Sequence, residues 1–590
     1  METFTAAVPD EGLLGFVRGP SLDPKTRTRI AEAVPEEFFT YPGGLTARDH
    51  QALTYDRLRR AGLAAPPAAE LLADPAALCA LLERAAIADP ALFHVMLLHY
   101  TLALGPILRF GAAQLTEDAG PGERGVRDAH DALASMDSFG TLLMTEVGRS
   151  NSHLSPRTIA RHDPASGGFV LSTPDVRAAK FPTSTAHPHL PKTAAVYATL
   201  VHGGAERGVF VFAVPLRGPG GEAAPGVRVV DAPETTGLQV DYAAVLLDDL
   251  TVPYGAWLRD GASIAADGTF HDPAGSPAAR LTRSMGIAPA VWRAVISASA
   301  AITRASAGTL LAHSAGRTTL GRLAPRRPLT DYRNQQEAVL GALAAGYALT
   351  AVAQHVKTAR TAADAPGGGT AGGPRTAWAP WSAVDRDLAL LKAAATVQAQ
   401  ETVSACRVHS GAPGFAAVER LNAYRGLAHA YMNAGGDNEL ILYDTARAMA
   451  DLDRYTPPDP GAGPPDGGDL HSPAVWLFLA RDAERRMRDR LAARVASATG
   501  GGADPFTAWN GNLVLAARTA AACADRTVLE ILAAAAGSGP GELAPVLGLH
   551  ALNLLDRRAC DELAPRAGAL AAAFELPAPL TAPAAFLTTP

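Results

Sequence analysis

The chain has 590 residues, of which 48% are hydrophobic and 19% charged, and its formal net charge at pH 7 is -6. A chain of this length exceeds what one hydrophobic core normally holds, so we expect three or four domains. The hydrophobic share excludes intrinsic disorder, and the slightly acidic balance argues against nucleic-acid binding, which needs a basic surface. A small anionic ligand held by a few arginines is compatible with this charge.

Metal, disulfide and membrane signals are weak. The four cysteines lie far apart, without the CxxC spacing of zinc sites. His187 and His189 share one loop, but two imidazoles are too few for a metal site, so no metal is expected. The N-terminus lacks the basic and apolar regions of a signal peptide, and no uncharged apolar run of about 18 residues suggests a membrane span. We therefore predict a cytoplasmic protein that binds no membrane.

The first 136 residues show a helical pattern and predict an N-terminal helical domain, with a buried helix over residues 93–108 that breaks near Gly105. From residue 137 the hydrophobic pattern becomes strand-like. Short runs rich in Val, Phe and Leu, each bounded by turn residues, are expected to be strands at 169–171, 196–201, 209–214, 227–230 and 243–247. The segment 137–262 is therefore predicted to be an antiparallel β domain.

Helical patterns return after the β region. Apolar residues from Val291 to Ala305 recur every three or four positions and predict one long helix, and residues 332–358 and 384–411 continue the pattern. Pro- and Gly-rich segments at 363–374 and 457–468 are typical of loops or linkers. We predict a helical domain over 275–455 and a C-terminal helical domain over 470–590, with helices at 473–497, 505–536 and 543–574. The predicted fold is mainly α with one central antiparallel β domain.

Three local patterns carry residues suited to ligand binding. MTEVGRSN over 144–151 places a hydroxyl and a glycine turn before the β region, which suits a planar heterocycle or an oxyanion. RTTLGR over 317–322 follows the long helix, and its first arginine suits a pyrophosphate or a helix C-terminus. CRVHSGAPGF over 406–415 precedes NAGGDNE over 433–439, where glycines allow close approach of a ligand and Asp437 or Asn438 suits a helix N-cap.

Together and in this order, the three patterns resemble the acyl-CoA oxidase and acyl-CoA dehydrogenase superfamily. RHDP at 161–164, VFVFAVPLR at 209–217 and WNGN at 509–512 add to the likeness. The length and the extra C-terminal helical domain point to the oxidase branch. The resemblance covers residues from about 80 to 575. It implies an α, β, α, α domain order, an oxidoreductase activity and FAD as cofactor.

The resemblance also assigns cofactor contacts. Thr145 and Gly148 fall in the loop that lies against the flavin in the family. Arg317 matches an arginine that reaches the FAD pyrophosphate across a subunit interface. Gly411 falls in the glycine loop that approaches the FAD from the partner subunit. The resemblance therefore implies a homodimer.

The family's catalytic base has no counterpart at its usual position. Oxidases have Phe-Glu-Gly-Glu-Asn before the last helix of the third domain, whereas residues 434–438 are Ala-Gly-Gly-Asp-Asn here, so Gly435 replaces the glutamate. Residues 280–285, where some dehydrogenases hold the base, contain no carboxylate either. Gly436, Asp437 and Glu439 follow at positions where family residues approach the cofactor. Asp437 is the candidate for a relocated base.

These departures leave three functions open. The first is an FAD-dependent oxidoreductase of acyl-CoA oxidase type that acts on an acyl thioester or a related small molecule, with a relocated base or none. The second is a flavin-dependent monooxygenase of the same fold that oxygenates nitrogen, sulfur or carbon. The third is an oxidase-like subunit that has lost catalysis and keeps a binding role. The resemblance favours the first.

Overall fold

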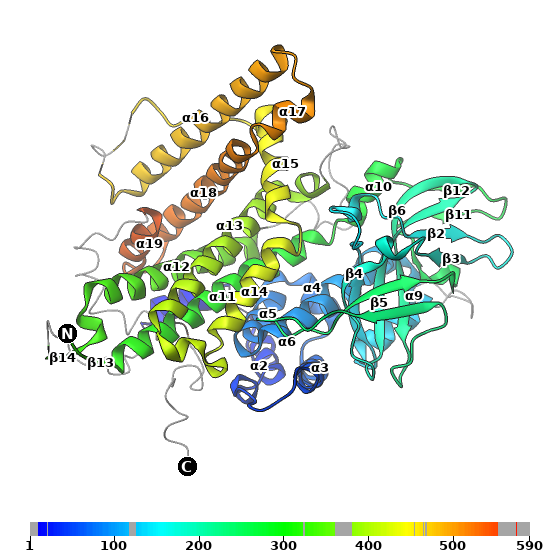
Figure 1. Cartoon of the computed structure of the whole chain (residues 1–590), viewed down its shortest axis with the longest axis horizontal. Helices are drawn as coiled ribbons and strands as arrows, with labels where there is room; N and C mark the ends of the chain where they lie inside the picture. The colour runs from blue at the N-terminus through cyan, green and yellow to red at the C-terminus, as the bar shows by residue number, and fades with distance from the viewer. Residues whose placement is uncertain are drawn as a thin grey trace.

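The computed structural model describes residues 10–20, 22–116, 125–321, 325–359, 380–453, 455–463, 465, 469–552 and 574. Figure 1 shows a unit of β-strands beside a larger body of helices, with α16 and α18 lying across one side of that body. The elements follow the predicted order of helices, strands, helices and a final set of helices.

The N-terminal region is helical, as predicted. Its helices are α1 (Glu11–Arg18), α2 (Pro24–Ala33), α3 (Ala47–Ala64), α4 (Ala68–Ala73), α5 (Pro75–Ala88), α6 (Pro90–Leu97), α7 (Gly105–Phe110), α8 (Ala112–Thr116) and α9 (Gly125–Ala134). Asp74 and Asp89 cap α5 and α6 by accepting backbone N–H groups, and a proline follows each cap.

The predicted break near Gly105 is wrong. A π-helical segment, Leu98–Leu104, connects α6 to α7, and the N–H of Gly105 donates to the carbonyl of Tyr100, five residues back. The wider π turn accommodates Pro106 without ending the helix.

The β domain contains the five predicted strands. They correspond to β3 (Phe169–Ser172), β5 (Lys192–His202), β6 (Ala205–Arg217), β7 (Val227–Asp231) and β8 (Tyr242–Leu247), and the others are β1 (Phe139–Leu143), β2 (Ile159–His162), β4 (Lys180–Ser184), β9 (Leu250–Val252), β10 (Trp257–Leu258), β11 (Ser263–Ile264) and β12 (Phe270–His271). The main sheet has the order β10-β6-β5-β2-β3-β9, with β1 beside β5, and a smaller sheet has the order β4-β8-β7. Most pairs are antiparallel as predicted, but β5 runs parallel to both β1 and β2.

Strands β5 and β6 contribute to two separate hydrophobic cores. One face, with Val196 and Phe212, packs into a core inside the β domain. The other face, with Tyr197 and Val211, packs into the large core shared with the helices. This alternation follows from the period of two along a strand, which places successive side chains on opposite faces.

The third set of helices surrounds one buried helix. The helices are α10 (Pro277–Ser284), α11 (Ala288–Ala315), α12 (Arg333–Thr358), α13 (Pro380–His409), α14 (Leu421–Asn433) and α15 (Asn438–Ala450), and the hairpin β13 (Thr318–Leu320) and β14 (Pro325–Pro328) joins α11 to α12. Nearly all of α11 is buried. Its buried Thr303, Ser306 and Thr309 each donate to the carbonyl four residues back, so their hydroxyls are satisfied without water.

The C-terminal helices are α16 (Pro473–Gly500), α17 (Pro505–Asn510), α18 (Leu513–Ser538) and α19 (Leu543–Leu552). The helix predicted over 505–536 is interrupted because α17 ends at Gly511. The helix predicted over 543–574 is seen to residue 552, and residues 553–573 lie outside the described residues, as does the predicted linker 363–374. The described part of the second linker has neither helix nor strand.

Three helical segments are long and apolar enough to cross a membrane by length and composition alone, although no such run was expected. They are Pro90–Phe110, Pro277–Ala315 and Arg333–Thr358. Between 83% and 94% of the most apolar window of each is buried inside the protein. Their hydrophobicity is that of core helices.

Candidate active site

The loop after β1 is fastened to the segment that leads into β4. The hydroxyl of Thr145 donates to the carbonyl of Phe181 at 2.6 Å, and the carbonyl of Thr145 accepts the N–H of Phe181 at 3.0 Å. Gly148 donates to the carbonyl of Arg177 at 2.8 Å. A Cβ at position 148 would lie 2.5 Å from Arg177 atoms, so this close approach requires glycine. Thr145 and Gly148 therefore belong to one rigid loop.

A buried ion pair supports this loop. Glu146 Oε1 lies 3.3 Å from Nζ of Lys180, and it also accepts from the N–H and the hydroxyl of Thr158. Burial works to raise the pKa of Glu146, but the charge of Lys180 and the hydrogen bonds hold that pKa below its usual range. The backbone N–H groups of residues 146, 147 and 148 all donate within the chain. The loop thus offers fewer free N–H groups than its glycine pattern suggested.

Arg317 and Gly411 lie together where α11 and α13 end. A Cβ on Gly411 would lie 3.6 Å from Arg317 Nη1, and Gly411 has a φ of +64°, a conformation that favours glycine. Arg317 is exposed, and its Nη1 lies 3.4 Å from His313 Nε2. No carboxylate in the described part of the chain pairs with Arg317, so its guanidinium is available to an anion.

Exposed apolar side chains surround this end of the helices. They are Leu320, Val408, Phe415 and Val418, with exposed fractions of 78%, 61%, 65% and 39%. The guanidinium of Arg407 lies 3.4 Å from the ring centre of Phe415. We call these residues, with Arg317 and Gly411, the Arg317 end. Exposed apolar surface of this kind is typical of a protein interface.

The turn between α14 and α15 contains the glycine at the expected base position. Gly435 and Gly436 have φ values of +70° and +94°, which residues with a Cβ rarely adopt. The carbonyl of Gly435 accepts from Nε1 of Trp292 at 2.7 Å, and a Cβ at 435 would lie 3.2 Å from Cγ1 of Val291. The turn is therefore held against α11.

A buried lysine supports the same turn from α13. Lys392 is 0% exposed, and its Nζ donates to the carbonyl of Gly436 at 2.6 Å and to Oδ1 of Asn438 at 3.0 Å. No carboxylate of the described residues lies within ion-pair distance of Nζ. Burial lowers the pKa of Lys392 to about 7, against the charge of Asp437, which raises it. The charged and neutral forms of the Lys392 amine are therefore about equally populated near physiological pH.

Asp437 and Glu439 begin α15. The carboxylate of Asp437 accepts from the N–H of Leu440 at 3.2 Å and from Nδ2 of Asn433 at 2.7 Å, so Asp437 is the N-cap of the helix. Glu439 is exposed in the first turn, where a negative charge is favourable. The contacts give Asp437 the capping role that the sequence left open beside the catalytic one.

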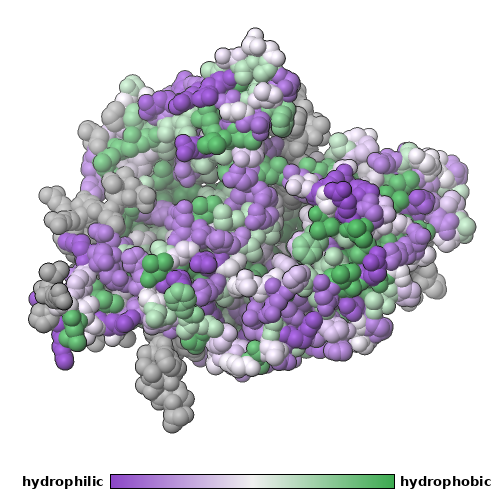
Figure 2. All heavy atoms as spheres, in the orientation of Figure 1, coloured by the Kyte–Doolittle hydropathy of each residue, from purple (hydrophilic) through white to green (hydrophobic). Residues whose placement is uncertain are grey.

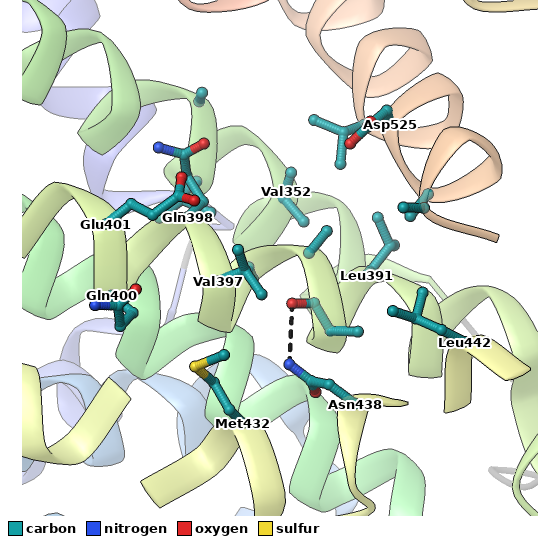
Figure 3. Close-up of a pocket in the computed structure, with 18 of the residues that line it drawn as sticks. Val352, Leu391, Val397, Gln398, Gln400, Glu401, Met432, Asn438, Leu442 and Asp525 are labelled. Carbon is teal, nitrogen blue, oxygen red and sulfur yellow. Dashed lines mark hydrogen bonds between the residues drawn. The ribbon is translucent and has the colours of Figure 1, made fainter. Parts of the chain in front are cut away.

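The turn borders a cavity of about 490 Å³ between the helical and the C-terminal domains. Figure 3 shows Glu401 and Gln398 on α13, Asp525 on α18 and Leu442 on α15 around it, with Asn438 donating to the carbonyl of Ala393. The acidic lining residues are Glu401, Asp437, Glu439 and Asp525, and no lysine or arginine is among the lining residues that the structure describes. The volume suits a small molecule, but these carboxylates repel a phosphate unless a cation is added.

Comparison with known proteins agrees with this architecture. Residues 291–450 match the family described as acyl-CoA oxidase, C-alpha1 domain. The putative acyl-coenzyme A oxidase 3.2, peroxisomal, of Arabidopsis thaliana is 26% identical over 522 residues, which cover 79% of this chain and 73% of that protein. These matches support the acyl-CoA oxidase and acyl-CoA dehydrogenase superfamily that the sequence patterns suggested.

Two solved acyl-CoA oxidases show the same fold. Acyl-CoA oxidase 1 from Yarrowia lipolytica has a TM-score of 0.78 at 17% identity, with 97% of this chain and 89% of that chain covered. Acyl-CoA oxidase-2 of Caenorhabditis elegans, bound with FAD, ascaroside-CoA and ATP, has a TM-score of 0.74 at 17% identity, with 96% and 89% covered.

A series of contacts connects the Thr145 loop to the Gly435 turn. The ring centre of Phe181 lies 6.4 Å from that of Tyr242, which lies 5.7 Å from that of His94. Nδ1 of His94 lies 2.9 Å from the hydroxyl of Tyr431, which stands four residues before Gly435. None of the contacts of Arg317 within the described chain reaches this series.

Sequence reasoning missed His94, Tyr431 and Lys392. His94 and Tyr431 are 337 residues apart, and neither belongs to a motif with a fixed spacing. Lys392 lies inside an apolar helical stretch, LALLKAAAT over 388–396. A single charged residue in such a stretch is the one signal that was available, because lysine is almost never fully buried without a partner.

Proposed function

We propose that this chain is an FAD-dependent oxidoreductase of acyl-CoA oxidase type that acts on an acyl thioester or a related small molecule without the family's glutamate. The Gly435 turn carries this proposal. It follows α14 at the place where the resemblance puts the base, and it holds two glycines in backbone conformations that favour glycine. Trp292 and Lys392 fix its shape. These contacts support a site in which the turn keeps a fixed shape and carries no carboxylate at position 435.

The residues of this chain suit FAD. Arg317 is exposed and has no carboxylate partner among the described residues, and the space beside Gly411 is open, so a pyrophosphate finds a cation and room there. Next to Thr145, the exposed fractions of Val147 and Val176 are 56% and 65%, which provides apolar surface for a planar ring. FAD, when bound, supplies the electron acceptor of the reaction.

We propose that the working unit is a homodimer in which Arg317 serves the cofactor of the other copy. Among the described residues of one chain, the contacts of Arg317 reach neither the Thr145 loop nor the Gly435 turn. The cavity beside the turn has an acidic lining and needs a cation from elsewhere to accept phosphate. The exposed apolar residues of the Arg317 end supply a surface that a second copy can cover.

The chain's own groups position the reacting molecules. The hydroxyl of Thr145 is bonded to Phe181 and fixes the shape of its loop. Lys392 and Asn438 hold the glycine turn, and Asp437 caps α15, so neither Lys392 nor Asp437 is free to move without loosening the turn. With no side chain at position 435, the space that a glutamate would fill is left to the substrate.

The absorbance spectrum of the purified protein, followed by anaerobic addition of acyl-CoA thioesters of several lengths, tests this proposal. We expect FAD bound at one per chain, bleaching of its absorbance by a thioester, and peroxide release when oxygen is readmitted. An oxygenated product in place of peroxide would favour the monooxygenase alternative and overturn the proposal. A protein that takes up no FAD would favour the binding role instead.

A further inference from the structure

Three buried polar side chains from three domains meet beside the candidate active site. Nδ1 of His94, on α6, lies 2.9 Å from the hydroxyl of Tyr431, on α14, and Nε2 of His94 lies 3.5 Å from Oγ of Ser184, on β4. Their exposed fractions are 6%, 4% and 1%. The N-terminal, helical and β domains therefore converge on one hydrogen-bonded histidine–tyrosine pair.

The pair lies between the two regions that the proposed function uses. On one side, Ser184 follows Phe181 by three residues in β4, and Phe181 is bonded to Thr145. On the other side, Tyr431 lies near Val295, one helical turn from the Val291 that a Cβ at position 435 would touch. Contacts within the described residues therefore connect the pair to both the Thr145 loop and the Gly435 turn.

Both members of the pair are uncharged at neutral pH. Burial lowers the pKa of His94 to about 4 and raises the pKa of Tyr431 well above its usual value. The phenol donates to Nδ1 when Nε2 carries the imidazole proton and faces Ser184. With its conjugate acid near 4, His94 has about the proton affinity of an ordinary glutamate, whose pKa is about 4.3.

We propose that Tyr431 and His94 together carry out the proton abstraction for which other family members use a glutamate. This rests on the proposed function. The C–H bond next to the thioester carbonyl breaks, and the phenol oxygen of Tyr431 takes its proton. The phenol's own proton passes to Nδ1 of His94, which becomes an imidazolium. The electron pair of the broken bond stays on the substrate as an enolate, and no group is oxidised or reduced in this step.

The groups around His94 affect its pKa and therefore its ability to accept the proton. The edge of the Tyr242 ring faces the imidazole at 5.7 Å between ring centres. Asp241 raises the pKa of His94 and Lys192 lowers it, and these two form a buried ion pair at 3.1 Å. Because their charges largely cancel, burial dominates the pKa of His94.

Exchange of the α-hydrogen with D2O tests the pair without requiring flavin turnover. The full-length, FAD-loaded protein is incubated without oxygen with butanoyl-CoA or octanoyl-CoA, and deuterium incorporation is followed by mass spectrometry. We expect Tyr431→Phe and His94→Gln to lower the exchange rate by ~10²–10⁴-fold, the usual contribution of a positioned base. In the wild type, the rate should rise with pH through about 4, as His94 becomes neutral, and this rise should be absent in His94→Gln.

Tyr424→Phe is the matched control. Tyr424 lies on the same helix, is 0% exposed, and its hydroxyl donates to the carbonyl of Ile87 at 2.7 Å. The substitution removes a buried phenol hydrogen bond of the same kind outside the pair. We expect exchange within about threefold of wild type, although its stability falls about as much as that of Tyr431→Phe.

The outcomes separate this proposal from the proposed function. If Tyr431→Phe binds FAD and exchanges at the wild-type rate, the pair is not the base and the proposed function stands. If the wild type binds no FAD and exchanges neither thioester, both proposals fail. Loss of exchange in both variants, with FAD content and melting temperature matched to Tyr424→Phe, supports the pair.

Discussion

At the scale of single residues, Gly435 is the position at which we propose that the family's glutamate is missing. Its φ of +70° is costly for any residue with a Cβ, by about 1–2 kcal/mol, and the Cβ would press on Val291. The backbone of this turn therefore disfavours any side chain, including a glutamate, at position 435. The glycine is part of how the turn is built.

We expect Gly435→Glu to remove native activity while FAD stays bound, because the carboxylate enters space proposed for the substrate. Its free energy of unfolding should fall by about 1–3 kcal/mol. Gly435→Ala is the control, since it shares the backbone strain without the charge. Melting temperature, FAD content and turnover of both variants measure the difference. Full activity in Gly435→Glu would place position 435 outside the pocket.

Asp437→Asn separates the two roles of Asp437. Because asparagine caps a helix about as well as aspartate, we expect turnover and the unfolding free energy to stay near wild type. Asp437→Ala should lose about 1 kcal/mol of stability through loss of the cap. Loss of turnover in Asp437→Asn at an unchanged melting temperature would restore the relocated base.

Lys392 should make stability depend on pH. Its pKa in the folded protein is about 7, whereas an unfolded lysine has a pKa of about 10.4. Between these values the unfolded chain binds more protons, so the lysine's contribution to stability rises as pH increases from about 7 to 10. The unfolding free energy of the wild type minus that of Lys392→Met, measured in urea titrations, should therefore increase over that range. A constant difference would contradict the buried, shifted amine.

At the scale of elements, hydrophobic periodicity predicted most of the structure. The spacing from Val291 to Ala305 indicated α11, and the apolar runs indicated β3, β5, β6, β7 and β8. Periodicity is local, so it contained no information on the parallel pairing of β5 with β1 and β2. The π-helical passage through Gly105 was missed for a related reason, because a Gly-Pro step breaks a helix in most contexts.

The site was predictable only where residues form a contiguous motif. Thr145, Gly148, Arg317 and Gly411 lie in motifs that resemblance located. The structure shows a close approach that requires glycine at 148 and a positive φ that favours glycine at 411. His94 meets Tyr431 only through packing of α6 against α14. Such long-range contacts depend on the whole fold, and no local pattern encodes them.

The Thr145 loop yields a prediction at this scale. A methyl group at position 148 would lie 2.5 Å from the carbonyl oxygen and the Cβ of Arg177, which cannot move without shifting the backbone. We expect Gly148→Ala to lower the unfolding free energy by about 1–3 kcal/mol and to weaken FAD binding by displacing the loop. Gly341→Ala, on α12 with open space around its Cβ position, is the control and should be neutral or stabilising by up to about 1 kcal/mol. Equal effects of both changes on FAD binding would contradict the prediction.

At the scale of the whole molecule, the exposed arginines lie in two different surroundings. Figure 2 shows hydrophilic residues along α16, with paler and hydrophobic atoms in the recess beneath it. The exposed arginines of α16 lie on a helix that also carries acids, such as Asp482 beside Arg486. Arg317 lies instead near exposed apolar side chains and forms no ion pair with a carboxylate among the described residues. Only the second setting is typical of a contact with an anionic ligand at an interface.

We expect Arg317→Ala to lower FAD affinity by roughly ten- to a hundredfold, because a charge-assisted contact is worth about 1.5–3 kcal/mol. Arg485→Ala, an exposed arginine on α16, is the control and should leave FAD affinity unchanged. Equilibrium dialysis with FAD measures both. Wild-type affinity in Arg317→Ala would show that Arg317 does not contact the pyrophosphate.

The two faces of β5 and β6 have a consequence for heat denaturation. Val196 and Phe212 belong to the core inside the β domain, and Tyr197 and Val211 belong to the core shared with the helices. Unfolding of either core also removes side chains of β5 and β6 from the other core, because the same two strands carry both sets of side chains. These two parts should therefore lose structure in a single calorimetric peak, although each has its own interior. A substitution buried among the strands should lower the midpoint recorded by a probe placed among the helices by the same number of degrees.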